Sequence, residues 1–148
     1  YAAEHPPIEP AVGYRFDYRG RSVVISGDGN VNGDTREIVD DVDLLLHDAL
    51  SVPTVTALSE ALGAAERPRQ SKVVADVLDY HASTDALIEL GEQSNVDMVA
   101  FYHLVPVPLN DVLEDVFKRG MPDHFLLAKD LMWFDLPIDS EEIIVNGP

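Results

Sequence analysis

The chain has 148 residues, of which 46% are apolar and 25% are charged, as is typical of one globular domain with its own core. Its 27 acidic and 10 basic side chains give a formal charge of −17, which argues against a surface that follows nucleic-acid phosphates or adheres to anionic lipid. The absence of cysteine excludes disulfides, thiolate metal sites and cysteine nucleophiles, and it leaves the redox compartment open.

The sequence predicts neither a membrane span nor a targeting segment. No apolar run approaches the roughly 20 residues that cross a bilayer. Residues 1–7 lack a basic region followed by an apolar one, so they do not form a signal peptide. We therefore expect no membrane partner, and the compartment stays undetermined. Because the chain opens at Tyr1 rather than at methionine, we expect that upstream residues have been removed.

The first part of the chain predicts a hairpin followed by a buried strand. After an irregular, proline-containing entry over residues 1–11, apolar residues alternate over 12–18, and an Arg-Gly turn leads to the apolar run 22–26. This pattern indicates a β-hairpin. A loop rich in Gly, Asn and Asp over 27–34 and a short helix over 35–41 come next, and the run 42–46 is typical of a buried strand.

The remainder of the chain alternates helices with strands. Helices are predicted over residues 55–65, 70–80, 85–93 and 111–119, the third capped by Ser83 or Thr84 and the fourth by Asn110. Strands are predicted over residues 96–102, 125–128, 131–136 and 142–145, and the aromatic run 131–134 is expected in the sheet core rather than in a substrate pocket. This order indicates α/β layers over a mixed sheet.

Polar side chains stand directly after three of the predicted strands. Asp28, His47 and His103 meet along one sheet edge if these strands are parallel neighbours, and His81, between two predicted helices, can face the same edge. Carboxylate with imidazole is the ligand set for zinc or a similar divalent ion. A lone histidine after a strand is more often a structural residue than a metal ligand, and the spacing of the histidines alone does not decide between these two roles. His124 is expected at the surface.

Residues 28–34, Asp-Gly-Asn-Val-Asn-Gly-Asp, offer a competing interpretation. Oxygen ligands at loop positions 1, 3 and 5 and glycine at position 6 match the start of a Ca²⁺ loop. Position 12 is Val39, where a bidentate acidic residue belongs, and the preceding segment is strand-like rather than helical. A Ca²⁺ loop over residues 28–34 therefore remains an alternative.

Five short motifs in register resemble the C-terminal half of a metallo-β-lactamase-fold hydrolase of the ribonuclease Z-like and arylsulfatase-like branch. The motifs comprise residues 4–5 with 13–15, 26–28, 43–49, 81–86 and 102–106. Their order and spacing agree with the family over nearly the whole chain, from about residue 4 to about residue 145. The resemblance implies an αββα sandwich, of which residues 1–148 form the C-terminal half with helices on the outer face of a mixed sheet. It also implies a dinuclear metal site at one sheet edge.

The resemblance assigns a role to four residues. His5, Asp28 and His103 match metal ligands, with Asp28 as the bridging carboxylate, and His81 matches a non-ligand histidine that protonates the leaving group. The implied cofactors are two divalent metal ions, zinc in the first place, with manganese or iron as alternatives. Such ions polarise the electrophile and lower the pKa of a water molecule.

The sequence departs from the family pattern in three places. The signature His-x-His-x-Asp-His belongs upstream of His5 and is absent, so the chain holds only part of the ligand set. The expected partner is therefore the N-terminal half of the same domain, or a separate chain that supplies it. Gly29 stands where the family has Thr, and Asp48 stands where it has Glu.

The resemblance implies hydrolysis by a metal-activated water. The arm with which ribonuclease Z grips tRNA does not fit between His5 and Asp28, which are 23 positions apart. Together with the negative charge, this favours a small ester, lactone, sulfate or phosphodiester as the substrate and predicts no nucleic-acid partner. The alternative from another class is a non-catalytic interaction or oligomerisation module, and homo-oligomerisation is left open.

Overall fold

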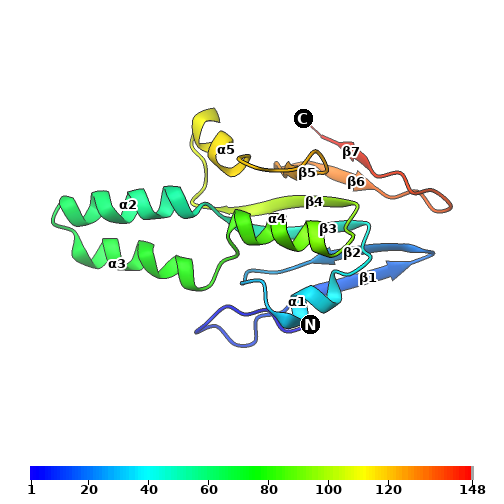
Figure 1. Ribbon diagram of the computed structural model, residues 1–148, viewed down its shortest axis with the longest axis horizontal. Helices are drawn as coiled ribbons and strands as arrows, with labels where there is room; N and C mark the ends of the chain where they lie inside the picture. Colours follow the sequence, from blue (N-terminus) through cyan, green and yellow to red (C-terminus); the bar gives the residue numbers. More distant parts are fainter. Residues whose placement is uncertain (148) are drawn as a thin grey trace.

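A computed structural model describes residues 1–147 and places a five-stranded sheet at the centre, in the order β1-β2-β3-β4-β5 (Figure 1). β1 pairs antiparallel with β2, which is the predicted hairpin, and β2 to β5 run parallel to one another. The predicted α/β layering over a mixed sheet is confirmed. The strands are β1 (Tyr14–Tyr18), β2 (Arg21–Ile25), β3 (Leu44–Leu50), β4 (Met98–Val105) and β5 (Phe125–Leu127).

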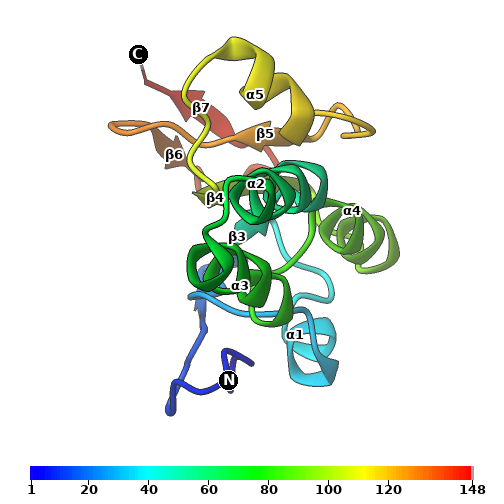
Figure 2. The same ribbon diagram turned by 90° about the vertical axis from the view of Figure 1, so that its left-hand side faces the viewer.

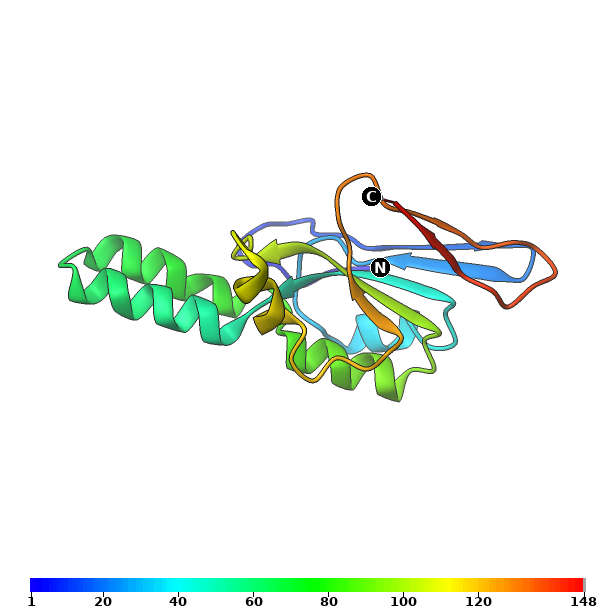
Figure 3. The same ribbon diagram turned by 90° about the horizontal axis from the view of Figure 1, so that it is seen from above.

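Helices α1 and α4 cover one face of this sheet, and the ribbon of β6 and β7 lies on the other side (Figures 2 and 3). The helices are α1 (Gly33–Ile38), α2 (Val52–Ala64), α3 (Pro68–Asp76), the short 3-10 turn η1 (Val77–Asp79), α4 (Thr84–Gln93) and α5 (Asp111–Phe117). Leu87 and Leu90 of α4 are fully buried against Leu45 and Phe101 of the sheet. Within residues 1–147, no helix has both the length and the apolarity that a membrane crossing requires.

Side-chain hydrogen bonds cap the N-termini of α1, α4 and α5. Ser83 caps α4 and Asn110 caps α5, each accepting a hydrogen bond from a backbone N–H of the first turn, as predicted. Asn32 caps α1 and forms a capping box with Thr35. These local hydrogen bonds satisfy N–H groups that have no partner within the helix.

Several elements extend beyond their predicted bounds. β3 and β4 continue through polar residues to Leu50 and Val105, because the two strands pair with each other from His47–Phe101 to Leu50–Val105, beyond the ends of β2 and β5. α2 and α3 begin earlier than expected, each with a proline in the first turn, where the missing N–H costs no hydrogen bond.

The prediction that residues 131–134 lie in the sheet core is wrong. β6 (Trp133–Asp135) and β7 (Ile144–Asn146) form a separate two-stranded ribbon. Leu131 is 82% exposed and Trp133 is 56% exposed. An apolar run indicates a strand but cannot tell whether a second layer covers it.

The face of the main sheet opposite α1 and α4 is apolar. Because successive side chains of a strand point to opposite faces, the residues next in sequence to the core residues line this second face. One row in register across the sheet consists of Tyr14, Ile25, Leu46, Ala100 and Leu126. At the β1–β2 end of that row, Tyr14 is 57% exposed and Ile25 is 37% exposed.

Candidate functional site

The carboxyl-end edge of the sheet brings together all four residues that the resemblance singles out. His103 Nε2 lies 3.5 Å from Asp28 Oδ2. The His81 ring centroid lies 5.5 Å from that of His103 and 5.1 Å from that of His5. Parallel pairing of β2, β3 and β4 explains this convergence, because the segments after parallel strands emerge at the same edge.

A β-bulge in β4 directs His103 toward Asp28. Asp48 pairs with Tyr102 and Ala49 pairs with Leu104, so His103 is the extra residue between two ladder positions. Its φ of 42° lies in the left-handed region, which is costly for a residue with a side chain. Such bulges re-aim side chains next to functional sites.

His5 is held at the site by the N-terminal segment. Glu4 forms an isolated bridge with Asn30, in the loop that carries Asp28. The His5 ring packs against Tyr80 with centroids 4.7 Å apart. Its Nδ1 is buried and has no hydrogen-bond partner among the described residues. Because an unpaired buried nitrogen is costly, a metal ligand role fits this atom.

His5 and Asp28 also line a common cavity of about 250 Å³. Imidazole nitrogen and carboxylate oxygen form a donor set that suits zinc. Within residues 1–147, however, no three histidine, aspartate or glutamate side chains are grouped closely enough to hold a metal ion by themselves. The donor chemistry therefore fits a divalent ion, while the set of ligands is incomplete.

Asp48 anchors the site from beneath and is completely buried. Its Oδ2 lies 2.7 Å from His81 Nδ1, and its Oδ1 accepts a 3.3 Å hydrogen bond from the Gly29 N–H. His47 Nδ1 lies 2.9 Å from Oδ1. Burial alone would raise the pKa of Asp48, but the hydrogen bonds and charges of His47 and His81 outweigh it and hold this pKa below its ordinary value of 3.8.

The loop that carries Asp28 lies directly against the N-terminal segment at Gly29. A Cβ at Gly29 would lie 3.1 Å from Glu4 O and 3.3 Å from Ala3 Cβ. This close approach explains why glycine stands where the resembling family has threonine. The Gly29 N–H still reaches Asp48, so the backbone of the loop remains tied to the site.

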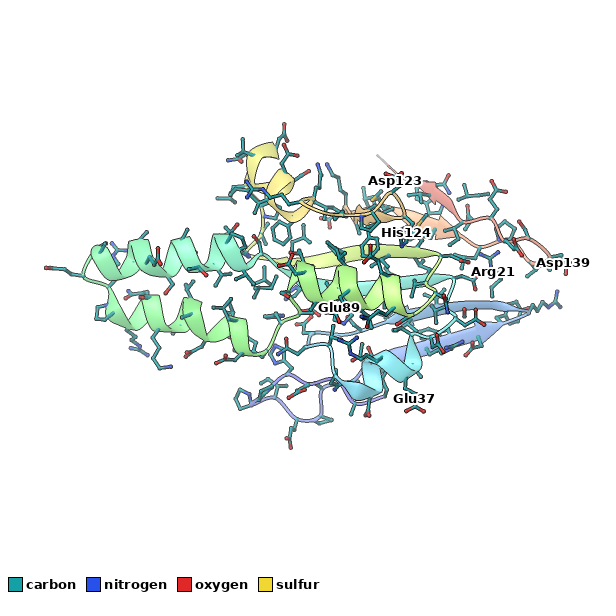
Figure 4. The ribbon with its side chains drawn as sticks, in the orientation of Figure 1. Arg21, Glu37, Glu89, Asp123, His124 and Asp139 are labelled. Carbon is teal, nitrogen blue, oxygen red and sulfur yellow. The ribbon has the colours of Figure 1, made fainter. Side chains whose placement is uncertain are left out.

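The other two histidines lie outside this convergence. His47, which the sequence predicts at the sheet edge, is 1% exposed within β3 and contacts Asp48 from inside the fold. His124, which is expected at the surface, is half-buried, with its ring centroid 4.8 Å from that of Phe125. Figure 4 shows it near the start of β5, away from the end of the sheet where α2 begins.

In the loop 28–34, the side chains of Asn30 and Asn32 make structural hydrogen bonds. Asn32 Oδ1 accepts a 2.8 Å hydrogen bond from the Thr35 N–H, and Asn30 Nδ2 donates a 2.7 Å hydrogen bond to Asp79 O. Helix capping explains the Asn-Gly-Asp spacing that suggested a Ca²⁺ loop. Among the described residues, no cluster of three or more His, Asp or Glu side chains that could hold a metal ion lies in this loop.

Asp48, the partner of His81, is a site residue whose role the sequence motifs did not indicate. The available signal was a carboxylate inside the apolar run that ends in Ala49, since a buried charge must be paired. Its partner could not be identified, because His81 is 33 positions away.

Comparison with known proteins found ribonuclease Z sequences and a related fold. Ribonuclease Z of Mycobacterium avium (strain 104) is 27% identical over 103 residues, covering 70% of this chain and 33% of that protein. Ribonuclease Z of Mycobacterium tuberculosis (strain H37Rv) is 27% identical over the same length and covers 34% of that protein. The chain thus spans about a third of these relatives. No family model matches.

A solved structure shows the same fold. The metallo-beta-lactamase fold protein YhfI from Bacillus subtilis superposes with a TM-score of 0.56 at 14% identity, covering 87% of this chain and 45% of that one. The expected fold class, the C-terminal half of an αββα sandwich, agrees with this neighbour and with helices on one face of the sheet.

The prediction of a small-molecule substrate with no nucleic-acid partner is wrong. The relatives are ribonucleases, which act on RNA. Two of the inferences behind this prediction do not hold. A net charge of −17 is a sum over the chain and says nothing about where a local positive surface lies. The short connection between His5 and Asp28 excludes an arm at that position only.

Proposed function

We propose that this ribonuclease Z-like chain of the metallo-β-lactamase fold contributes part of a dinuclear zinc site that hydrolyses phosphodiesters in RNA. The observation that carries the proposal is the convergence of His5, Asp28 and His103 beside His81. Likeness to ribonuclease Z supports RNA as the substrate. The remaining ligands would come from a segment or chain outside these 148 residues, in line with the third of its relatives' length that the chain spans.

His5, Asp28 and His103 are the residues that would hold the metal ions. Two divalent ions at such a site polarise a phosphoryl oxygen and provide a nucleophilic water at neutral pH. Each carboxylate oxygen of Asp28 has lone pairs that it could donate to a cation, so this side chain could contribute to both metal sites. The bulge in β4 positions His103, and the bridge between Glu4 and Asn30 positions His5 next to the loop of Asp28.

His81 would act as the general acid. In hydrolysis, the oxygen of water bonds to phosphorus and the bond from phosphorus to the leaving ribose oxygen breaks. That oxygen takes a proton from the imidazolium form of His81, and the proton that the attacking water loses passes to solvent, from which the imidazole is protonated again. Asp48 engages Nδ1, which leaves Nε2 to donate this proton. Burial would raise the pKa of Asp48, but hydrogen bonds from His47 and His81 lower it. The carboxylate therefore keeps its negative charge beside the His81 ring.

The test compares metal content and RNA cleavage in the whole protein. Asp28→Asn should lose bound zinc and abolish cleavage of a labelled RNA, because an amide is a poor ligand between two cations. Asp123→Asn removes an exposed carboxylate near β5 and is the matched control (Figure 4). Full zinc content in Asp28→Asn would contradict the ligand assignment. A wild-type protein that binds zinc but cleaves no RNA would contradict the substrate assignment.

A further inference from the structure

The hairpin of α2 and α3 projects from the edge of the molecule that carries the site (Figure 1). α2 begins at Val52, directly after β3, and α3 returns through η1 to His81. Both ends of the hairpin are therefore anchored beside the candidate general acid. With 13 residues in α2 and a rise of about 1.5 Å per residue, the tip lies roughly 20 Å from its base.

The tip of this hairpin concentrates positive charge. Arg67, Arg69 and Lys72 lie within six positions and are exposed, in a chain with only 10 basic residues. Glu66 is the one acidic residue between positions 63 and 72, so this segment carries a formal charge of +2. The rest of the chain must then carry −19, so the tip opposes the prevailing charge.

Basic side chains elsewhere are dispersed, and several of them are neutralised. Ion pairs join Arg15 to Asp17, Arg21 to Asp43, and both Lys118 and Lys129 to Glu114. Arg67 and Arg69 form no ion pair within residues 1–147. Lys72 contacts Asp76 at 2.7 Å, but this pair is exposed and contributes little in water. Two guanidinium groups at the tip are thus available to an anion.

We propose that the hairpin tip, defined as Arg67, Arg69 and Lys72, binds the phosphate backbone of the RNA whose cleaved phosphodiester lies at His81. This inference rests on the proposed function. A polyanion is repelled by the chain as a whole and is attracted where the local charge is positive. Guanidinium groups bind phosphate through paired hydrogen bonds. At roughly 20 Å from its base, the tip can contact phosphates several nucleotides away from the cleaved one.

The test measures RNA binding separately from cleavage. Fluorescence anisotropy with a labelled 24-nucleotide RNA hairpin, in the presence of EDTA, compares the whole protein with its Arg67→Gln/Arg69→Gln variant. The variant should bind about tenfold more weakly at low salt, and the slope of log affinity against log salt should fall by about 2. Arg36→Gln/Arg119→Gln removes two exposed arginines elsewhere and should match wild type.

A second measurement separates the tip from the metal site. With metal bound, the ratio of RNA cleavage to turnover of the chromogenic probe bis(p-nitrophenyl) phosphate should fall in the tip variant, because the probe does not reach the tip. Equal RNA affinity and salt slope in the tip variant and the control would overturn the inference. So would a tip variant that changes only the oligomeric state in sedimentation. Failure of wild type to cleave either substrate would contradict the proposed function instead, while the anisotropy result would still decide the tip.

Discussion

His81 Nδ1 lies 2.7 Å from Asp48 Oδ2, and both side chains are buried although the residues come from different elements. This contact orients the ring toward His5 and His103 at the sheet edge. Since Asp48 is also held by the Gly29 N–H, one carboxylate links the loop of Asp28 to the candidate acid. The first two predictions depend on this relationship.

Asp48→Asn should reduce turnover of RNA by about 10²-fold, at the lower end of what general acid catalysis contributes, because His81 loses its charged partner. Asp48→Glu keeps the carboxylate and should retain more turnover.

The pKa of Asp48 is lowered in the folded protein, so the ionised carboxylate adds stability above about pH 4, and this stability is lost as pH falls through the folded pKa. The stability difference between wild type and Asp48→Asn, measured by urea unfolding, should therefore shrink below pH 4. A constant difference would contradict the ionised, paired state of Asp48.

His81→Ala should keep the zinc content and lose about 10²–10⁴-fold in turnover, because the proton donor is removed while the proposed ligands remain. The loss should be smaller for substrates with nitrophenolate leaving groups, which need little protonation. His124→Ala, away from the site, is the matched control. Metal analysis, thermal melting and turnover on both kinds of substrate distinguish the roles. A lower melting temperature with unchanged turnover per folded molecule would leave His81 with a structural role only.

Gly91→Ala should destabilise the fold by about 1–3 kcal/mol, because a Cβ there would lie 2.6 Å from the Phe125 ring and 3.1 Å from Val99. Gly63→Ala, in the projecting hairpin, is the control. Its Cβ has room, 3.6 Å from Ser71, and the better helix propensity of alanine should stabilise by up to about 1 kcal/mol. Denaturant unfolding measures both. Similar effects at the two positions would mean that α4 is not packed closely on β5.

Asp97→Asn should stabilise the protein at neutral pH. Partial burial, with the nearby negative charge of Asp43, raises the pKa of Asp97 above its ordinary value of 3.8. The ionised form is therefore disfavoured in the folded state, and this cost disappears as pH falls below the raised value. The melting temperature of Asp97→Asn should exceed that of wild type at pH 7, and the two should approach each other in acid. A gain that persists unchanged below pH 4 would contradict this explanation.

The exposed β1–β2 end of the apolar sheet face, where Tyr14 and Ile25 lie, should be covered in the whole protein, because large apolar patches are rarely left in water. The chain has no cysteine, so single cysteines within it are clean probes. Ile25→Cys should react slowly with a maleimide, whereas Val107→Cys, at a side chain 71% exposed, should react quickly. Equal rates would indicate that nothing packs on this face.

Local patterns determined the elements of this protein and much of their order. The hairpin over β1 and β2, the caps at Ser83 and Asn110 and the alternation of helices with strands depend on residues within a few positions of one another. Such contacts are visible in a sequence because helices and strands have fixed periods. The motifs around His5, Asp28, His81 and His103 likewise carried the family resemblance, and their order along the chain is a property of the sequence alone.

Tertiary structure alone decided which polar residues meet. Asp48 and His81 are 33 positions apart, and their hydrogen bond depends on β3 and the turn before α4 reaching the same edge. The bulge that turns His103 requires the register of two strands, and the exposure of Trp133 depends on which layers form. Charge shows the same limit. The sum of −17 is fixed by composition, whereas the positive tip at Arg67 and Arg69 exists as a surface only because two helices carry it away from the acidic body. Electrostatic attraction depends on distance, which composition does not contain.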